Sequence, residues 1–83
     1  MLNRRKLKFD CQHKVLDFIM KMSESESKDE FVIEDYEGHL RVNARSITGV
    51  LYATKDFEDI YLRNCEHPGC FPDFIEKFMD EEG

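Results

Sequence analysis

The sequence predicts an α+β fold, a two-layer open-faced sandwich in which a four-stranded antiparallel sheet is covered on one face by three helices. Short β-prone runs indicate four strands, and three other segments carry apolar residues at three- and four-residue spacing, which is typical of helices. These segments follow one another as strand, helix, strand, strand, helix, strand, helix, without an internal repeat. Since crossover connections are right-handed, all three helices are expected on one face, with the other face left to water.

The first half of the chain supplies three strands and one helix. A strand is expected over 4–9, where Leu7 and Phe9 alternate with lysines, and Asp10 then ends it. A helix from Cys11 to about Met22 follows from its apolar stripe, and the serine- and glutamate-rich stretch 23–29 is expected to be a loop. Two strands within 31–42 form a hairpin that turns at Gly38.

The second half adds a helix, a strand and a last helix. The second helix is expected over 46–53 and the fourth strand over 57–63. Pro72 suits the first turn of a third helix, and the residues 80–83 after it are expected to fray. That helix carries the strongest stripe in the sequence: Phe71, Phe74, Ile75, Phe78 and Met79. The length of 83 residues fits one domain, 1–83.

Composition narrows the class of function. The chain has 12 Lys and Arg against 18 Asp and Glu, a net charge of -6, which argues against nucleic acid as a partner. No apolar run is long enough for membrane insertion and no secretory signal is recognisable, so a cytoplasmic protein is expected. The chain is also expected to be a monomer. Its three cysteines, an odd number, fit a reducing compartment.

The segment from Tyr36 to Leu51, YEGHLRVNARSITGVL, resembles the central signature of the HPr family, the phosphocarriers of the bacterial phosphoenolpyruvate:sugar phosphotransferase system. In that family an aromatic-x-Gly hairpin leads into Val-Asn-x-Lys/Arg-Ser-Ile-x-Gly-Val/Leu. The resemblance implies an HPr-like fold without a cofactor. It also implies protein partners: enzyme I, sugar permease subunits, HPr kinase or a catabolite-control transcription regulator.

Ser46 stands at the start of the second predicted helix, where its hydroxyl can cap the helix and where a phosphate would meet a positive dipole end beside Arg45. The resemblance implies regulatory phosphorylation of Ser46 and partner docking through the residues around it: Arg45, Ile47, Val50 and Leu51. The residues alone also allow Ser46 to be a simple helix cap. They also allow Ile47, Val50 and Leu51 to be core residues, and for Val50 the core position is favoured.

The phosphocarrier site of the family is written Gly-x-His-Ala-Arg-Pro-Ala, and here the corresponding region reads FDCQHKVL from Phe9 to Leu16. His13 lacks the glycine, the arginine and the proline, so a surface histidine is favoured over a phosphoryl acceptor. The favoured function is therefore a divergent, non-enzymatic regulatory and docking module, and the alternative is an active phosphocarrier using His13. Cys11, at the helix start, is either a reactive thiol or a small buried residue, and burial is favoured.

A third class of function is a small metal-binding module through Cys65, His67 and Cys70. Zinc sites want four ligands, so Cys11 or His13 would have to join this set. The favoured interpretation is a loop with two buried thiols and one exposed imidazole. Hydrolytic chemistry has no support, because the sequence has no nucleophile elbow, glycine-rich phosphate loop or convincing carboxylate pair.

Overall fold

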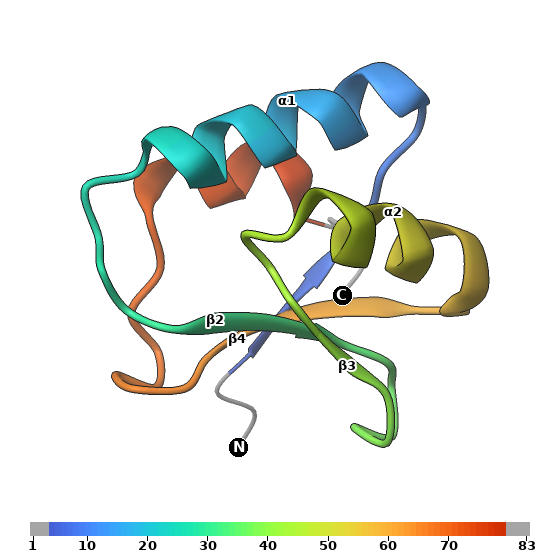
Figure 1. Ribbon diagram of the computed structural model, residues 1–83. Coiled ribbons are helices and arrows are strands. Elements are labelled where there is room, and N and C mark those ends of the chain that lie inside the picture. Colours follow the sequence, from blue (N-terminus) through green and yellow to red (C-terminus); the bar gives the residue numbers. More distant parts are fainter. Residues whose placement is uncertain (1–3, 80–83) are drawn as a thin grey trace.

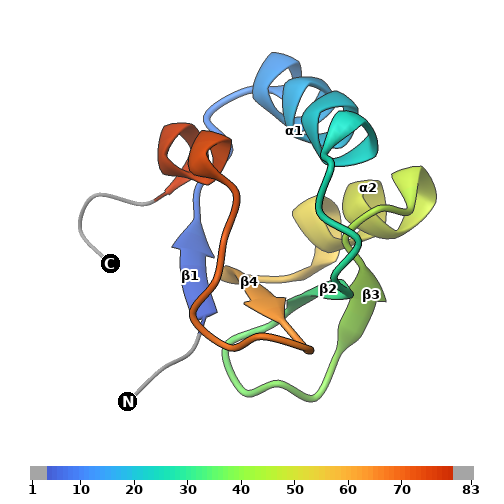
Figure 2. The same ribbon diagram turned by 90° about the vertical axis from the view of Figure 1, so that its left-hand side faces the viewer.

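The computed structural model describes residues 4–79, and the expected fraying of 80–83 lies outside them. Helical segments cover one side of a four-stranded sheet in both views (Figure 1, Figure 2), so the α+β class and the one-sided arrangement are confirmed. The elements follow the order β1 (Arg4–Leu7), α1 (Gln12–Glu24), β2 (Phe31–Glu34), β3 (Arg41–Asn43), α2 (Ile47–Asp56), β4 (Ile60–Asn64) and the 3-10 helix η1 (Asp73–Phe78).

The sheet has the order β1-β4-β2-β3, and every neighbouring pair is antiparallel. Ile33 of β2 pairs with Leu62 of β4 on one side and with Val42 of β3 on the other. The two central strands carry the fully buried side chains of Phe31, Ile33 and Leu62 toward the helices. Alternation then directs Glu34 of β2 and Arg63 of β4 to the opposite face.

The core lies between the sheet and the helices. Val15, Phe18 and Met22 of α1 are buried at the spacing that the sequence stripe predicts. Phe9 follows β1 instead of belonging to it, and its ring lies 5.4 Å from that of Phe18 and 5.9 Å from that of Phe78. This aromatic cluster joins β1, α1 and η1.

The last helix differs from the prediction. Residues 73–78 form a 3-10 helix and not an α-helix. Ile75 donates its N–H to the carbonyl of Pro72, three residues before it (3.1 Å), which is the 3-10 pattern, and Lys8 donates to the carbonyl of Phe78 at the end of the segment (2.8 Å). The helix type was therefore wrong. Of the predicted stripe, Ile75 and Phe78 are buried, and Phe71, Phe74 and Met79 are partly buried against the core.

The predicted boundaries of the α2–β4 connection were also wrong. Phe57 does not begin the fourth strand but ends α2, and its N–H donates to the carbonyl of Ala53 (2.9 Å). Its buried ring belongs to the core, which explains why it fitted an apolar strand pattern.

The face of the sheet that the helices do not cover carries a network of charged side chains. Glu34 is fully buried, and its carboxylate faces one arginine from each of the other three strands. The Nε of Arg63 donates to Oε1 at 2.5 Å, the Nη1 of Arg4 lies 3.7 Å from Oε1, and the Nε of Arg41 lies 3.5 Å from Oε2. This face was expected simply to meet water, but its centre carries a buried carboxylate with three cationic partners.

Arg4 extends this network to the hairpin turn. Its guanidinium lies 4.0 Å from the ring centroid of Tyr61, and its Nη2 donates to the carbonyl of Tyr36 (2.8 Å). Gly38 in that turn has a φ of 75°, and a Cβ there would lie 2.9 Å from Oε2 of Glu34. The turn therefore needs glycine both for its backbone conformation and for its approach to the carboxylate.

Removal of the Glu34 carboxylate should destabilise the fold strongly. Glu34→Ala leaves Arg4, whose side chain is only 8% exposed, without its counter-charge, and we expect the free energy of unfolding to fall by about 3 kcal/mol or more. Urea unfolding measures the change. Glu37→Ala, at an exposed position of the hairpin, should cost less than about 0.5 kcal/mol, and equal losses in the two variants would contradict the central role of Glu34.

Candidate functional site

The helices α1 and α2 lie side by side above the sheet and run in opposite directions (Figure 1). Cys11 and Gln12 at the start of α1 line one hollow of about 540 Å³ together with Leu51 and Thr54 of the second half of α2. At the other end of the seam, Arg45 before α2 donates to the carbonyl of Met22 in α1. These contacts fix which flanks of the two helices face each other.

Large apolar side chains are exposed along this seam. Leu16 is 49% exposed and Met20 is 59% exposed, one and two helical turns after Gln12 on the same flank of α1. Ile47 is 58% exposed and Leu51 is 36% exposed, one turn apart on the facing flank of α2. We call these four residues the interhelical patch. The sequence predicted two of them, Ile47 and Leu51, and missed the pair on α1, although its i, i+4 spacing beside the core stripe was visible.

Val50 does not belong to this patch. Its side chain is fully buried in the core cluster, so its inclusion among the docking residues was wrong and the core interpretation is confirmed. Gly49 beside it explains why the helix packs so closely on the sheet, because a Cβ there would lie 3.2 Å from the Cβ of Val42 and 3.3 Å from the carbonyl oxygen of Asn43.

Ser46 is the N-cap of α2, as one of the two interpretations predicted. Its Oγ accepts a hydrogen bond from the N–H of Gly49 (3.1 Å) and lies 3.2 Å from Oγ1 of Thr48. Ser46 is half-buried. The cap is confirmed, and phosphorylation of Ser46 stays a prediction.

Arg45 holds the loop that follows α1. Its guanidinium donates to the carbonyls of Met22 (2.6 Å), Ser27 (2.6 Å) and Asp29 (3.3 Å). A cation at this place also suits the negative end of the α1 dipole. A docking role for Arg45 stays a prediction, but its donors are already used inside the domain.

The start of α1 presents two exposed groups. Cys11 is the N-cap without a side-chain capping bond, and its exposure shows that the burial favoured from sequence was wrong. His13 is exposed, as expected, and the neighbouring ammonium of Lys14 lies 3.5 Å from Asp10. The side chain of His13 has no hydrogen bond or ion pair within residues 4–79, and a phospho-acceptor role for it stays a prediction.

Cys65, His67 and Cys70 are not brought together as a metal site. Both thiols are exposed, so their predicted burial was wrong, and partial desolvation raises the pKa of the Cys65 thiol. The imidazole pairs instead with a carboxylate, because Nδ1 of His67 lies 3.0 Å from Oδ2 of Asp29. The exposure of His67 was predicted correctly.

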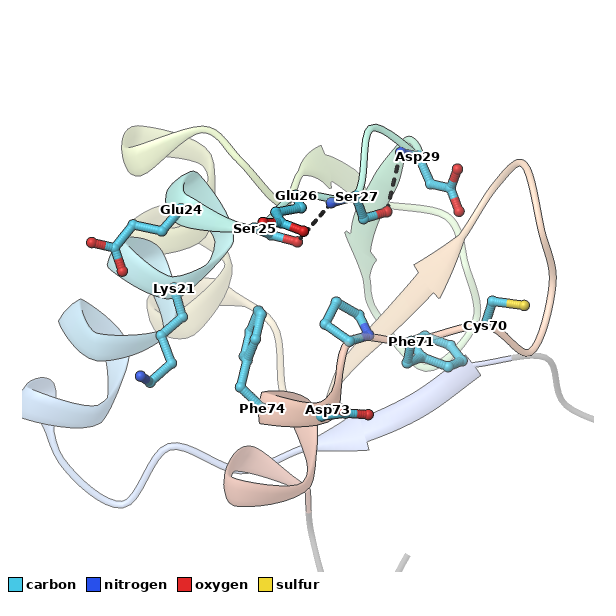
Figure 3. A pocket seen from close by; sticks show the side chains of 11 residues that line it. Lys21, Glu24, Ser25, Glu26, Ser27, Asp29, Cys70, Phe71, Asp73 and Phe74 are labelled. Atoms are coloured by element: carbon cyan, nitrogen blue, oxygen red, sulfur yellow. Dashed lines mark hydrogen bonds between the residues drawn. The ribbon is translucent and has the colours of Figure 1, made fainter.

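A second hollow, of about 560 Å³, lies between the end of α1, the loop 24–29 and the segment 70–74 (Figure 3). Oγ of Ser25 accepts from the N–H of Ser27, and Oγ of Ser27 accepts from the N–H of Asp29, both at 3.3 Å, which fixes the course of the loop. Acidic side chains outnumber the single lysine in its lining: Glu24, Glu26, Asp29 and Asp73 against Lys21. This hollow is therefore unsuited to a phosphate or another anion.

Comparisons of the chain with protein-family models, with curated proteins and with solved structures each find no match. Within residues 4–79, no helix has both the length and the apolar character that crossing a membrane requires.

The cap at Ser46 can be tested by stability. Ser46→Ala removes the acceptor of the Gly49 N–H and should lower the free energy of unfolding by about 1 kcal/mol. Ser46→Asp should change it much less, because aspartate also caps and its charge suits the helix start. Urea unfolding of both variants checks this, and equal losses would contradict the capping role.

The free energy of unfolding should depend on pH through the carboxylate of Asp29. The hydrogen bond from Asn64, helped by His67, lowers the pKa of Asp29 in the folded chain, so its ionised form stabilises the fold above the unfolded pKa of about 4. Asp29→Asn should therefore be less stable than the parent at pH 7, with a difference that shrinks as the pH falls below about 4. Urea unfolding across this range measures the difference, and a difference that does not change with pH would contradict the role of the ionised carboxylate.

Proposed function

We propose that this chain is an HPr-like docking module of the phosphotransferase system that binds protein partners through the interhelical patch. The exposed apolar surface of Leu16, Met20, Ile47 and Leu51 is the observation that carries this proposal. Large apolar side chains gathered on one surface favour protein contact, because covering them releases ordered water. The module needs no cofactor and performs no reaction of its own.

The fold supports this proposal through the segment that resembles the HPr signature. The element order and the helices on a single face agree with the fold that the resemblance implies. Within the segment, the hairpin at Gly38, the cap at Ser46 and the close packing at Gly49 together direct Ile47 and Leu51 outward. Each of these signature residues has a structural reason to be there.

Ser46 gives this surface a point of control. It immediately precedes Ile47, so a phosphate on its hydroxyl would add about two negative charges at the edge of the patch. Partners that approach with acidic groups would then be repelled, and partners with an arginine cluster would be attracted. HPr kinase and a catabolite-control transcription regulator are the proposed partners at this position, and enzyme I and sugar permease subunits are those proposed for the unmodified surface.

The alternative function is phosphoryl transfer through His13. Its imidazole is exposed in the first turn of α1, three residues before Leu16, so a partner on the patch would reach it. A phosphoryl group there would lie near the positive end of the helix dipole. No arginine follows His13 as it does in the family motif, and for this reason the docking function is preferred.

Binding to enzyme I from the organism that encodes the chain tests the proposal. Ile47→Glu should raise the dissociation constant at least about tenfold, because it places a charge in the apolar patch. It should leave the fold intact, since a glutamate suits the first turn of α2. Leu40→Glu is the matched control, because Leu40 is 46% exposed but lies on the hairpin. Calorimetry measures both, and equal affinities or no binding of the parent would contradict this docking role.

The same mixture supplied with phosphoenolpyruvate distinguishes docking from phosphoryl transfer. If the module only docks, the intact mass of the chain stays unchanged while enzyme I is phosphorylated. A gain of one acid-labile phosphoryl group by the parent, absent from His13→Ala, would replace the docking proposal by the carrier function.

A further inference from the structure

The loop before β2 and the loop after β4 bring together three side chains that commonly bind metals. Asp29 comes from the first loop, and Glu66 and His67 come from the second. One ligand atom from each of these residues lies within 4.8 Å of the others. From this arrangement we propose that Asp29, Glu66 and His67 form a binding site for one zinc ion.

The ligand types and their spacing suit zinc. Imidazole nitrogen and carboxylate oxygen bind zinc at about 2.0–2.2 Å, and a tetrahedral ion then spaces its ligand atoms roughly 3.3–3.6 Å apart. Nδ1 of His67 and Oδ2 of Asp29 are 3.0 Å apart, so a small opening of this pair admits the ion. The Oε2 of the exposed Glu66 accepts the N–H of Glu30 at 3.0 Å. Further lone pairs of this carboxylate are left for the ion, and a water molecule would complete the coordination.

A buried asparagine positions these ligands through hydrogen bonds. Asn64 is 1% exposed, and its Nδ2 donates to Oδ2 of Asp29 (2.9 Å). Its Oδ1 accepts from the backbone N–H groups of Glu66 and His67, each at 2.9 Å. One buried side chain at the end of β4 thus positions the three residues of the site, as the outer-shell partners of metal ligands do.

Zinc binds the ionised form of a carboxylate and a ring nitrogen of histidine that carries no proton. The lowered pKa of Asp29 keeps its carboxylate ionised. Zinc binding at Nδ1 of His67 requires that the proton facing Asp29 moves to Nε2, or leaves the ring when the imidazole is doubly protonated.

Titration of the metal-free full chain with zinc chloride in a calorimeter tests the site at pH 7.5. The parent should bind one zinc ion, and His67→Ala should lower the affinity at least about tenfold. His39→Ala is the matched control, because His39 is also exposed but lies in the hairpin turn, and it should bind as the parent does. The double variant Cys65→Ser/Cys70→Ser should bind zinc with the affinity of the parent, because the proposed site does not use the thiols.

Three results would overturn the proposal: no zinc uptake by the parent, the same affinity in His67→Ala as in the parent, or an equal loss in His67→Ala and the cysteine double variant. A measurement on the parent alone guards against a folding defect in the variants. On addition of zinc, the ring protons of His67 should shift in the NMR spectrum while those of His39 and His13 stay in place, and equal shifts of all three would also overturn it.

Discussion

The buried carboxylate of Glu34 is the constraint on which the sheet depends. A carboxylate without solvent is costly unless charged donors compensate it, and here each of the other strands contributes one arginine to it. The edge strand β3 has only three residues, too few to fix its register by apolar pairing alone. A shift of this strand by one residue would turn Arg41 to the wrong face, so the network specifies its alignment.

This network also explains why the exposed apolar surface lies on the helices. The outer face of the sheet is occupied by charged side chains and by Tyr61, which is covered by the guanidinium of Arg4. On the other face, α1 and α2 bury one flank in the core and leave the flank along their seam open. The domain therefore has one polar face and one face with apolar side chains, and the second has the character of a protein interface.

The layers of the fold could be predicted from the sequence because the spacing of apolar residues indicates which side chains are buried. The stripe of Val15, Phe18 and Met22 was sufficient to place α1 on the sheet. The same reasoning could not predict Glu34, because a single acid in a short strand is expected in water and only the tertiary arrangement of three arginines stabilises it. It also missed the pairing of His67 with Asp29, since these residues are distant in sequence and only the positions of β2 and β4 bring their loops together.

Arg45 joins the two regions for which functions are proposed. Its guanidinium binds the backbone carbonyl of Asp29 and that of Met22, and it immediately precedes Ser46 at the edge of the interhelical patch. The same guanidinium also binds the carbonyl of Ser27, so one side chain joins the end of α1 and the loop that carries Asp29 to the residue before the start of α2. A cation suits this position because the carbonyls at the end of a helix carry a partial negative charge.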